Sequence, residues 1–258
     1  MSSLRFEYRF SSKLTQQEIN DILLVLDGTF SKATAVEVFR WKYLKNPYGD
    51  SLHMIAYDDS LNGISRSVGS MGFWRNDLDS ESPAYQCVDL AVLPSYQGKG
   101  IFGETLDECV ERLGGAYLYT FPNSDSQPGF QRRGWCMQRK MPISLHLPTG
   151  VLREYAKREP IPDDYAKWRF VKNPEKQYYI YHSDGQSFLL SKRDRGLFIV
   201  GGMLSGDFGL PEVRPRILLS SDFPGRIIRL PRKPAVILEN HCYVANPGFI
   251  SRYRSDTL

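Results

Sequence analysis

Residues 85–103 constrain the fold of this 258-residue chain more than any other stretch. An apolar run from Cys87 to Leu93 ends at Pro94, and after a polar turn Gly98 and Gly100 lead into a helical pattern. The apolar face of that pattern carries Phe102, Leu106, Cys109, Val110 and Leu113. The stretch therefore predicts a strand, a glycine turn and a helix. Because the first N–H groups of a helix lack partners within it, such a turn can bind phosphate.

Two common phosphate-binding loops are disfavoured by the surrounding residues. Residues 98–103 match the dinucleotide pattern G-x-G-x-x-G, but residues 94–97 separate them from the strand. The next strand-like run, 116–121, also lacks an acidic residue at its end. A P-loop is excluded because the upstream glycine and the Ser or Thr after the lysine are lacking.

The stretch resembles motif A of the GNAT superfamily of acyl-CoA N-acyltransferases, in which a loop Gln/Arg-x-x-Gly-x-Gly/Ala follows a Val-x-Pro turn. Val92 and Pro94 supply the turn, residues 97–101 fit the loop, and Phe102 stands where the motif has glycine or alanine. Further along, residues 128–135 resemble motif B, with Phe130 in place of its usual tyrosine. The resemblance covers residues 50–140.

The resemblance implies an α/β (α+β) fold, the GNAT fold, in which a mostly antiparallel mixed sheet is flanked by helices. Local patterns follow the same order. They predict a strand over 4–10, a helix that begins with the capping box of Thr15 and Glu18, and a second helix over 34–44. Strands are predicted over 53–57 and 63–74.

A short phrase of the sequence recurs further along the chain, and this internal echo bears on the domain organisation. The phrase WKYLKNP at 41–47 recurs as WRFVKNP at 168–174, and Pro-Gly-Phe at 128–130 recurs at 247–249. The echo predicts a duplicated fold whose second copy lacks the glycine loop, with chance recurrence as the alternative. We expect a GNAT acetyl-CoA-binding domain over 1–145 and a degenerate GNAT-like domain over 146–258 that completes the acceptor cleft.

The cofactor implied by the resemblance is acetyl-CoA. Leu90, Ala91 and Val92 on the central strand are expected to bond its pantetheine and acetyl carbonyl, and Phe130 is expected to contact it. The expected ligands of its pyrophosphate are Gln97, Gly98, Lys99, Gly100, Ile101, Phe102 and Gly103.

Acyl transfer to an amine requires a neutral amine and a stabilised leaving thiolate. Asp89 is the candidate base, acting directly or through water, and a structural ion pair is the alternative. Strand alternation would place it on one face with Cys87 and Ala91. The resemblance makes Asn123 a second catalytic candidate, which would bind the cofactor or an ordered water. Phe130 lacks the hydroxyl that protonates the thiolate, so another group donates or the thiolate leaves unprotonated.

The acceptor is predicted from charge and aromatic residues. The net charge is +4, and between residues 213 and 234 six basic side chains accompany one acidic side chain. This segment is either a solvated face or a cradle for an anionic substrate. The candidate substrate-binding residues are Trp41, Asn46, Tyr48, Trp74, Arg226 and Arg229, and core packing is the alternative for the aromatic ones.

Residues 39–49 read Phe-x-Trp-Lys-Tyr-x-x-Asn-Pro-Tyr-Gly before motif A. Together with a degenerate second half, this phrase is similar to GNAT enzymes that acetylate dTDP-3-amino-3,6-dideoxyhexoses in bacterial surface-polysaccharide synthesis. We therefore expect a small-molecule amine acceptor, with a dTDP-linked amino sugar favoured. One alternative is a GNAT acetyltransferase for a peptide, polyamine or aminoglycoside amine. Another is a non-catalytic module that binds acyl-CoA.

Composition favours a globular chain, since 41% of the residues are hydrophobic and 13% aromatic. No apolar run approaches the ~20 residues that span a bilayer, and the first residues show no signal peptide. We expect a cytoplasmic protein without membrane or nucleic-acid partners, and consider a homodimer. The cysteines and histidines show no ligand spacing, so we expect no metal site and assign the cysteines to the core.

Overall fold

The computed structural model describes residues 3–30, 33–61, 66–76, 83–141, 144–193, 196–220, 226–227 and 240–244, with the backbone alone for 136–141, 226–227 and 240–244. The chain divides into two compact units. One comprises Met1–Gln138 and Cys242–Phe249, and the other comprises Arg139–His241 and Ile250–Leu258. The expected boundary at residue 145 stays a prediction. Residues 242–244 belong to the first unit, although they lie far beyond this boundary in the sequence.

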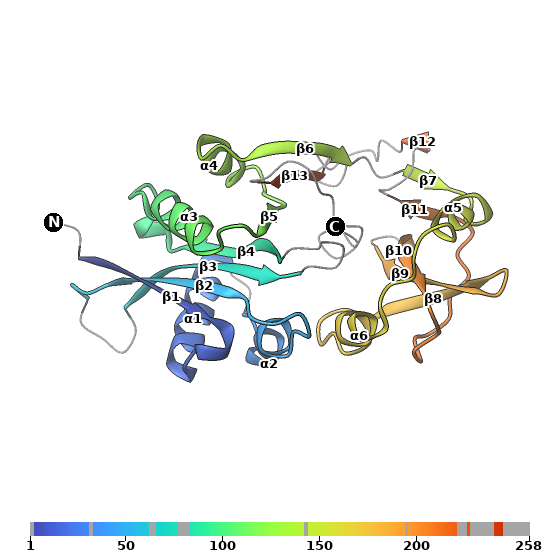
Figure 1. Cartoon of the computed structure of the whole chain (residues 1–258), viewed down its shortest axis with the longest axis horizontal. Helices are drawn as coiled ribbons and strands as arrows, with labels where there is room; N and C mark the ends of the chain where they lie inside the picture. The colour runs from blue at the N-terminus through green and yellow to red at the C-terminus, as the bar shows by residue number, and fades with distance from the viewer. Residues whose placement is uncertain are drawn as a thin grey trace. The chain divides into compact units, whose positions relative to one another are not determined.

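The first unit is built on a seven-stranded sheet in the order β1-β2-β3-β4-β5-β13-β6 (Figure 1). β1 to β4 form an antiparallel meander, whereas β4 and β5 are parallel. The strands are β1 (Leu4–Phe10), β2 (Leu52–Asp58), β3 (Ser67–Arg75), β4 (Ala84–Val92), β5 (Tyr117–Thr120), β6 (Cys136–Met141) and β13 (Asn240–Val244).

Helices on both faces of this sheet complete the first unit. In Figure 1, α1 lies below the sheet and α3 lies above it. The helices are α1 (Gln16–Phe30), α2 (Val36–Phe39), α3 (Ile101–Arg112) and α4 (Gln127–Arg132), with the short turns η1 (Ser11–Lys13), η2 (Arg40–Leu44, π-helical) and η3 (Pro94–Tyr96). This order of helices and strands is the one implied by the resemblance, so the predicted fold class is confirmed.

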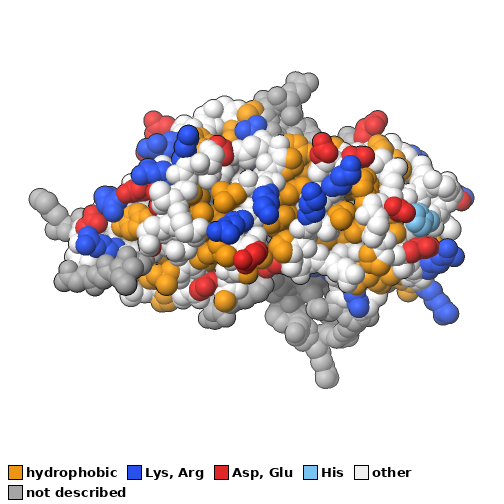
Figure 2. Space-filling model, turned by 90° about the horizontal axis from the view of Figure 1, so that it is seen from below, with side chains coloured by type: hydrophobic (Ala, Val, Ile, Leu, Met, Phe, Trp, Pro, Cys, Tyr) orange, Lys and Arg blue, Asp and Glu red, His pale blue; other side chains and the backbone are white. Residues whose placement is uncertain are grey.

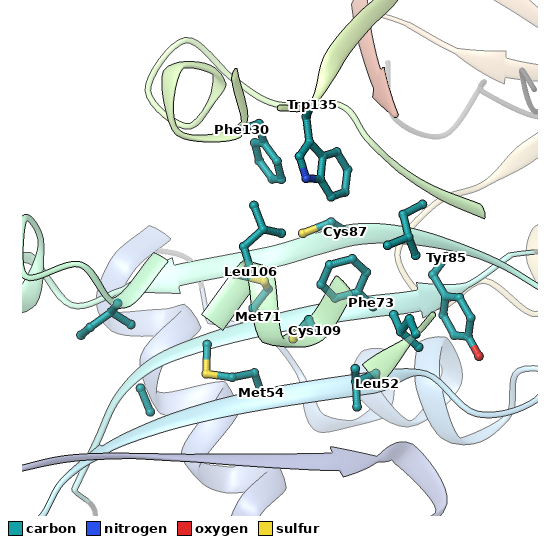
Figure 3. Packing of buried hydrophobic residues seen from close by; sticks show 14 of the residues in the cluster. Leu52, Met54, Met71, Phe73, Tyr85, Cys87, Leu106, Cys109, Phe130 and Trp135 are labelled. Atoms are coloured by element: carbon teal, nitrogen blue, oxygen red, sulfur yellow. The ribbon is translucent and has the colours of Figure 1, made fainter. Parts of the chain in front are cut away.

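Local signals in the sequence explain where the helices begin and which faces they bury. The Thr15 N–H donates to Glu18 Oε2 over 2.7 Å, and the Glu18 N–H donates back to Thr15 Oγ1 over 3.2 Å, which confirms the capping box. The predicted apolar face of α3 is confirmed as well, because Leu106, Cys109 and Leu113 are buried in the main core. That core lies between the sheet and α3, with Phe130 and Trp135 packed near Cys87 (Figure 3).

The sheet of the second unit repeats much of the strand arrangement of the first with fewer strands. Its sheet has the order β12-β7-β11-β10-β9-β8. The strands are β7 (Ser144–His146), β8 (Tyr178–Ser183), β9 (Gln186–Lys192), β10 (Phe198–Leu204), β11 (Leu218–Ser220) and β12 (Arg226–Ile227). The helices are α5 (Pro148–Tyr155), α6 (Asp163–Ala166) and the π-helical η4 (Lys167–Val171).

The two units correspond at specific points. Each echoed phrase forms a π-helical turn, η2 or η4, directly after a four-residue α-helix and before an antiparallel hairpin. In each unit the hairpin leads to a bulged strand that pairs in parallel with the next one, β4 with β5 and β10 with β11. β13 holds the place between β5 and β6 that β7 holds between β11 and β12. Duplication therefore explains the echo better than chance does.

In the second unit, the side chain of Tyr155 bridges β10 and β11 just beyond their last paired residues. The Tyr155 hydroxyl donates to the Val200 carbonyl over 3.2 Å and lies 3.1 Å from Ser220 Oγ, which can donate to it in turn. In the first unit, the residues at the corresponding point line an open cleft. Tyr155 thus fills the place at which the first unit is hollow.

Replacing Tyr155 with phenylalanine is expected to lower the free energy of unfolding by about 1–3 kcal/mol, because the Val200 carbonyl and the Ser220 hydroxyl stay buried without this partner. Chemical denaturation would measure the change. Tyr179→Phe is the matched control, since the Tyr179 hydroxyl makes an exposed 3.4 Å contact with Gln177, and it is expected to change stability by less than about 0.5 kcal/mol. Equal losses in the two variants would contradict a role for the Tyr155 hydroxyl.

Candidate functional site

The candidate site of the first unit is a cleft at the splayed ends of β4 and β5. These strands pair from Ala84 and Tyr117 as far as Cys87 and Thr120, where β5 ends while β4 continues to Val92. The cleft has a volume of about 170 Å³. It is lined by Cys87, Val88, Asp89, Leu90, Thr120, Phe121, Pro122, Asn123, Ser126 and Phe130. Four residues predicted from the sequence, Asp89, Leu90, Asn123 and Phe130, thus meet in one hollow.

A bulge in β4 presents Asp89 to this cleft. Val88 lies opposite Gly72 and Ala91 opposite Ser70, so β4 has one more residue than β3 between these pairs. Asp89 takes a φ of 50°, in the left-handed region that aspartate enters more readily than most residues. Regular alternation stops at the bulge, so the prediction that alternation sets the direction of Asp89 is wrong. Its side chain is 31% exposed, whereas Cys87 and Ala91 are buried.

The Asp89 carboxylate has two partners from η2. Lys42 Nζ lies 2.8 Å from Asp89 Oδ2, and the Tyr43 hydroxyl donates to the same oxygen. Burial favours the protonated acid, but the charge of Lys42 and the two hydrogen bonds outweigh it and hold the pKa of Asp89 below its ordinary value. The carboxylate is therefore ionised at neutral pH. The ion pair expected as the structural alternative is present, and a catalytic role for Asp89 stays a prediction.

No sequence pattern marks Lys42 or His53 as a neighbour of Asp89, whereas Tyr43 belongs to the aromatic residues of the element that precedes β2. The Lys42 ammonium lies 5.0 Å from the ring centre of Tyr43 and 5.9 Å from that of Trp74. At these distances the aromatic rings attract the positive charge of Lys42. Burial and Asp89 raise the pKa of Tyr43 well above its ordinary value. Tyr43 and Asp89 are 46 positions apart, so no local sequence pattern predicts their contact.

The glycine loop has the backbone geometry that an anion site needs. Gly98 and Gly100 have φ values of 78° and 84°, and Gly100 is the N-cap of α3. Within the described part of the chain, the N–H groups of residues 98–102 have no acceptor. The Tyr96 hydroxyl, just before the loop, donates to Asp58 Oδ2 over 2.7 Å, and Lys99 Nζ lies 4.1 Å from the centre of the Tyr96 ring. The loop is thus anchored to the end of β2.

Other cofactor candidates occupy defined places. The Val92 carbonyl accepts a 3.1 Å hydrogen bond from Gln97 Nε2, which ties the strand end to the loop. Phe102 packs edge-on against Phe130 at 5.1 Å between ring centres, and a Cβ at Gly129 would come within 2.5 Å of the Phe102 ring. Phe102 therefore packs against α4. A Cβ at Gly103 would meet the Arg133 guanidinium.

The candidate substrate residues of the first unit make structural contacts. Trp41 and Trp74 are 7% and 3% exposed, and the Trp74 indole N–H donates to the Lys42 carbonyl over 3.1 Å. Asn46 Nδ2 donates to the Arg75 carbonyl over 2.8 Å, and Asn46 Oδ1 accepts from the Tyr48 N–H over 3.0 Å. Their role in substrate binding stays a prediction.

The predicted basic segment is described only in part. Arg229 and the side chain of Arg226 lie outside the described residues. Arg214, at its start, pairs with Glu212 over 2.9 Å, and its side chain is 78% exposed, as the solvated-face alternative predicts. On the face drawn in Figure 2, lysine and arginine side chains are interspersed with apolar and acidic ones.

His53 is buried against the rings of Tyr43 and Phe39 and is expected to make the protein acid-sensitive. Its ring is 4.4 Å from that of Tyr43 and 5.4 Å from that of Phe39, and its Nε2 has no hydrogen-bond partner among the described residues. Burial lowers the pKa of His53 to about 3, whereas an unfolded histidine has a pKa of about 6.5. The unfolded chain thus binds a proton first as the pH falls.

From this histidine we expect stability to fall by up to about 1.4 kcal/mol per pH unit between about pH 6.5 and pH 3. Denaturant titrations at a series of pH values would measure the slope. His53→Leu should flatten it, while His182→Leu, which changes an exposed histidine on β8, should leave it unchanged. The same slope in the His53 variant would show that other groups cause the acid sensitivity.

No protein-family model matches the sequence, and no curated protein sequence does. Solved structures similar to the chain include an acyl-CoA N-acyltransferase from Pseudomonas aeruginosa, at 17% identity over 54% of this chain and 91% of that one, with a TM-score of 0.41. The ribosomal-protein-S18-alanine N-acetyltransferase from Escherichia coli is similar at 14% identity over 54% and 81%, with a TM-score of 0.40. Eis1 from Mycobacterium abscessus is similar at 12% identity over 88% and 67%, with a TM-score of 0.48.

None of the helices in the described ranges combines the length and the apolar character that a membrane crossing requires.

Proposed function

We propose that the chain is a GNAT-type N-acetyltransferase that moves an acetyl group from acetyl-CoA to the primary amine of a nucleotide-linked amino sugar. The observation that carries the activity is the cleft between the diverging ends of β4 and β5, together with the glycine loop that follows β4. The N–H groups of this loop have no acceptor among the residues that the structure describes. An extended pantetheine can pair with the open edge of β4 while the loop holds its pyrophosphate. Acetyl-CoA combines these two chemical features.

Residues of the cleft take separate roles in this proposal. The amine attacks the acetyl carbonyl directly in a ternary complex, with the carbonyl held by backbone groups of residues 90–92. Asp89 receives or orients the amine, since its carboxylate is ionised and lines the cleft. Asn123 binds cofactor or water beside it. Tyr155 closes the corresponding point of the second unit, so we expect one CoA per chain.

The dTDP-3-amino-3,6-dideoxyhexose acceptor rests on the sequence. The net positive charge lies mainly beyond residue 145, and arginine forks suit a diphosphate. We assign acceptor binding to residues 146–258 for this reason, together with Trp41, Asn46, Tyr48 and Trp74. Arg226 and Arg229 would take the diphosphate.

One observation favours this acceptor over a polyamine or aminoglycoside. A polycationic acceptor needs an acidic cleft, but Lys42 already neutralises Asp89. Two alternatives remain. One is a peptide amine as the acceptor. The other is a non-catalytic acyl-CoA-binding module, for which the observation is Phe130, whose ring has no proton to donate to the leaving thiolate.

Release of free CoA thiol would test the proposal. Acetyl-CoA is mixed with the protein and a dTDP-3-amino-3,6-dideoxyhexose, and glucosamine and spermidine are assayed in parallel. Turnover on the order of 1 per second with the nucleotide sugar alone is the expected result. Turnover with spermidine alone would favour the polyamine alternative. Binding of CoA without turnover on any of the three would favour the binding module.

A further inference from the structure

The cleft lacks the tyrosine hydroxyl of motif B, but its lining contains a serine hydroxyl. Phe130 and Ser126 both line it, and Ser126 lies four residues, about one helical turn, before Phe130. Ser126 is the N-cap residue of α4 and is half-buried. Ser126 and the ring at the position of the usual proton donor thus line the same cleft.

Apart from Ser126, the hydroxyl, thiol and carboxyl groups of the cleft are committed, weak or unable to donate. Thr120 Oγ1 donates to the Cys87 carbonyl over 2.9 Å, and this bond is buried. Burial raises the pKa of the Cys87 thiol well above its ordinary value, and a thiol is a weak donor. Asp89 is ionised and can only accept. The exposed Asn123 side chain directs its oxygen into the turn before α4.

The Ser126 hydroxyl can be released at little cost. It donates to Asn123 Oδ1 over 2.8 Å. The same oxygen also accepts the backbone N–H groups of Asp125 at 3.2 Å and of Ser126 at 2.9 Å. Two donors therefore still satisfy this oxygen when the hydroxyl rotates toward the cleft, and the turn keeps its shape.

We propose that the Ser126 hydroxyl donates a hydrogen bond to the sulfur of CoA and stabilises the leaving thiolate in place of a tyrosine. The proposal rests on the proposed function and names a further catalytic residue for it. The amine nitrogen bonds to the acetyl carbon, the C–S bond breaks, and its electron pair stays on the sulfur. Ser126 keeps its proton throughout. The proton lost by the nitrogen passes to the thiolate, giving the amide and free CoA thiol.

The ionisation of bound CoA tests this without an acceptor. The ultraviolet absorbance of the thiolate is titrated with pH at saturating CoA, and the titration of the free protein is subtracted. Ser126→Ala should raise the pKa of the bound thiol by about one unit, because a hydrogen bond to a charged group is lost. Ser126→Thr should keep the wild-type value. Ser124→Ala is the matched control, because Ser124 is exposed, donates to Asp125 and does not line the cleft.

Kinetics give a second readout. Ser126→Ala should lower kcat about 10- to 100-fold with little change in the KM for acetyl-CoA. Adding Phe130→Tyr to that variant should restore part of the rate. Bound CoA that titrates identically in the wild type and in Ser126→Ala would overturn the proposal. A wild-type protein that does not bind CoA at all would overturn the proposed function itself, and with it this inference.

Discussion

Replacing Gly100 with glutamate should abolish CoA binding, with the Kd for CoA rising about 100-fold or more, which corresponds to ~2.7 kcal/mol. Gly100 has a φ of 84° and caps α3, so any side chain there adds strain at the point where the pyrophosphate is expected. A Cβ at this position would lie 3.8 Å from Glu104 Oε1, so the new carboxylate would join an acidic neighbour. Two negative groups at the start of α3 would repel a diphosphate. Isothermal titration calorimetry with CoA measures the effect.

The control for this variant is Gly115→Glu. Gly115 has a φ of 80°, is exposed, and has nothing within 4 Å of the position of its Cβ. The strain of a side chain in the left-handed region is thus matched, while the position is in the turn after α3. We expect normal CoA affinity in this variant. Unchanged affinity in Gly100→Glu, with the protein folded by circular dichroism, would rule out the glycine loop as the pyrophosphate site.

Replacing Asp89 with asparagine should lower kcat by about 100-fold or more if Asp89 is the base that accepts the proton of the amine. Asparagine tolerates the same left-handed backbone and can still accept a hydrogen bond from Tyr43, so the substitution removes the charge and keeps the shape. The KM for acetyl-CoA should change little. Because the pKa of Asp89 is held below its ordinary value of about 3.9, the wild-type rate should not fall through Asp89 until the pH is below that value.

Asp184→Asn is the matched control for that substitution. Asp184 has a φ of 51° in the turn between β8 and β9, is exposed, and lies in the second unit. It should retain wild-type kcat and stability. Full activity in Asp89→Asn would leave the carboxylate only its structural role, as the partner of Lys42 and Tyr43.

The sequence by itself determined the features that depend on short stretches. The capping box of Thr15 and Glu18 is local, because both residues lie in one turn of chain. The apolar face of α3 follows from its periodicity, and the glycine loop follows from residues that alone accept a positive φ at low cost. The echo between residues 41–47 and 168–174 predicts a duplication, and each copy builds the same π-helical turn.

Only the tertiary structure decided the features that depend on pairing between distant strands. The bulge at Asp89 arises from the register of β4 on β3, and the sequence of β4 reads as a regular strand. The contacts of Asp89 with Lys42 and Tyr43 join residues 47 and 46 positions apart. The placement of β13 beside β5 likewise needs the folded sheet. Side-chain direction and long-range contact are set by sheet register, which no local pattern encodes, and therefore the cleft itself could not be predicted from the sequence.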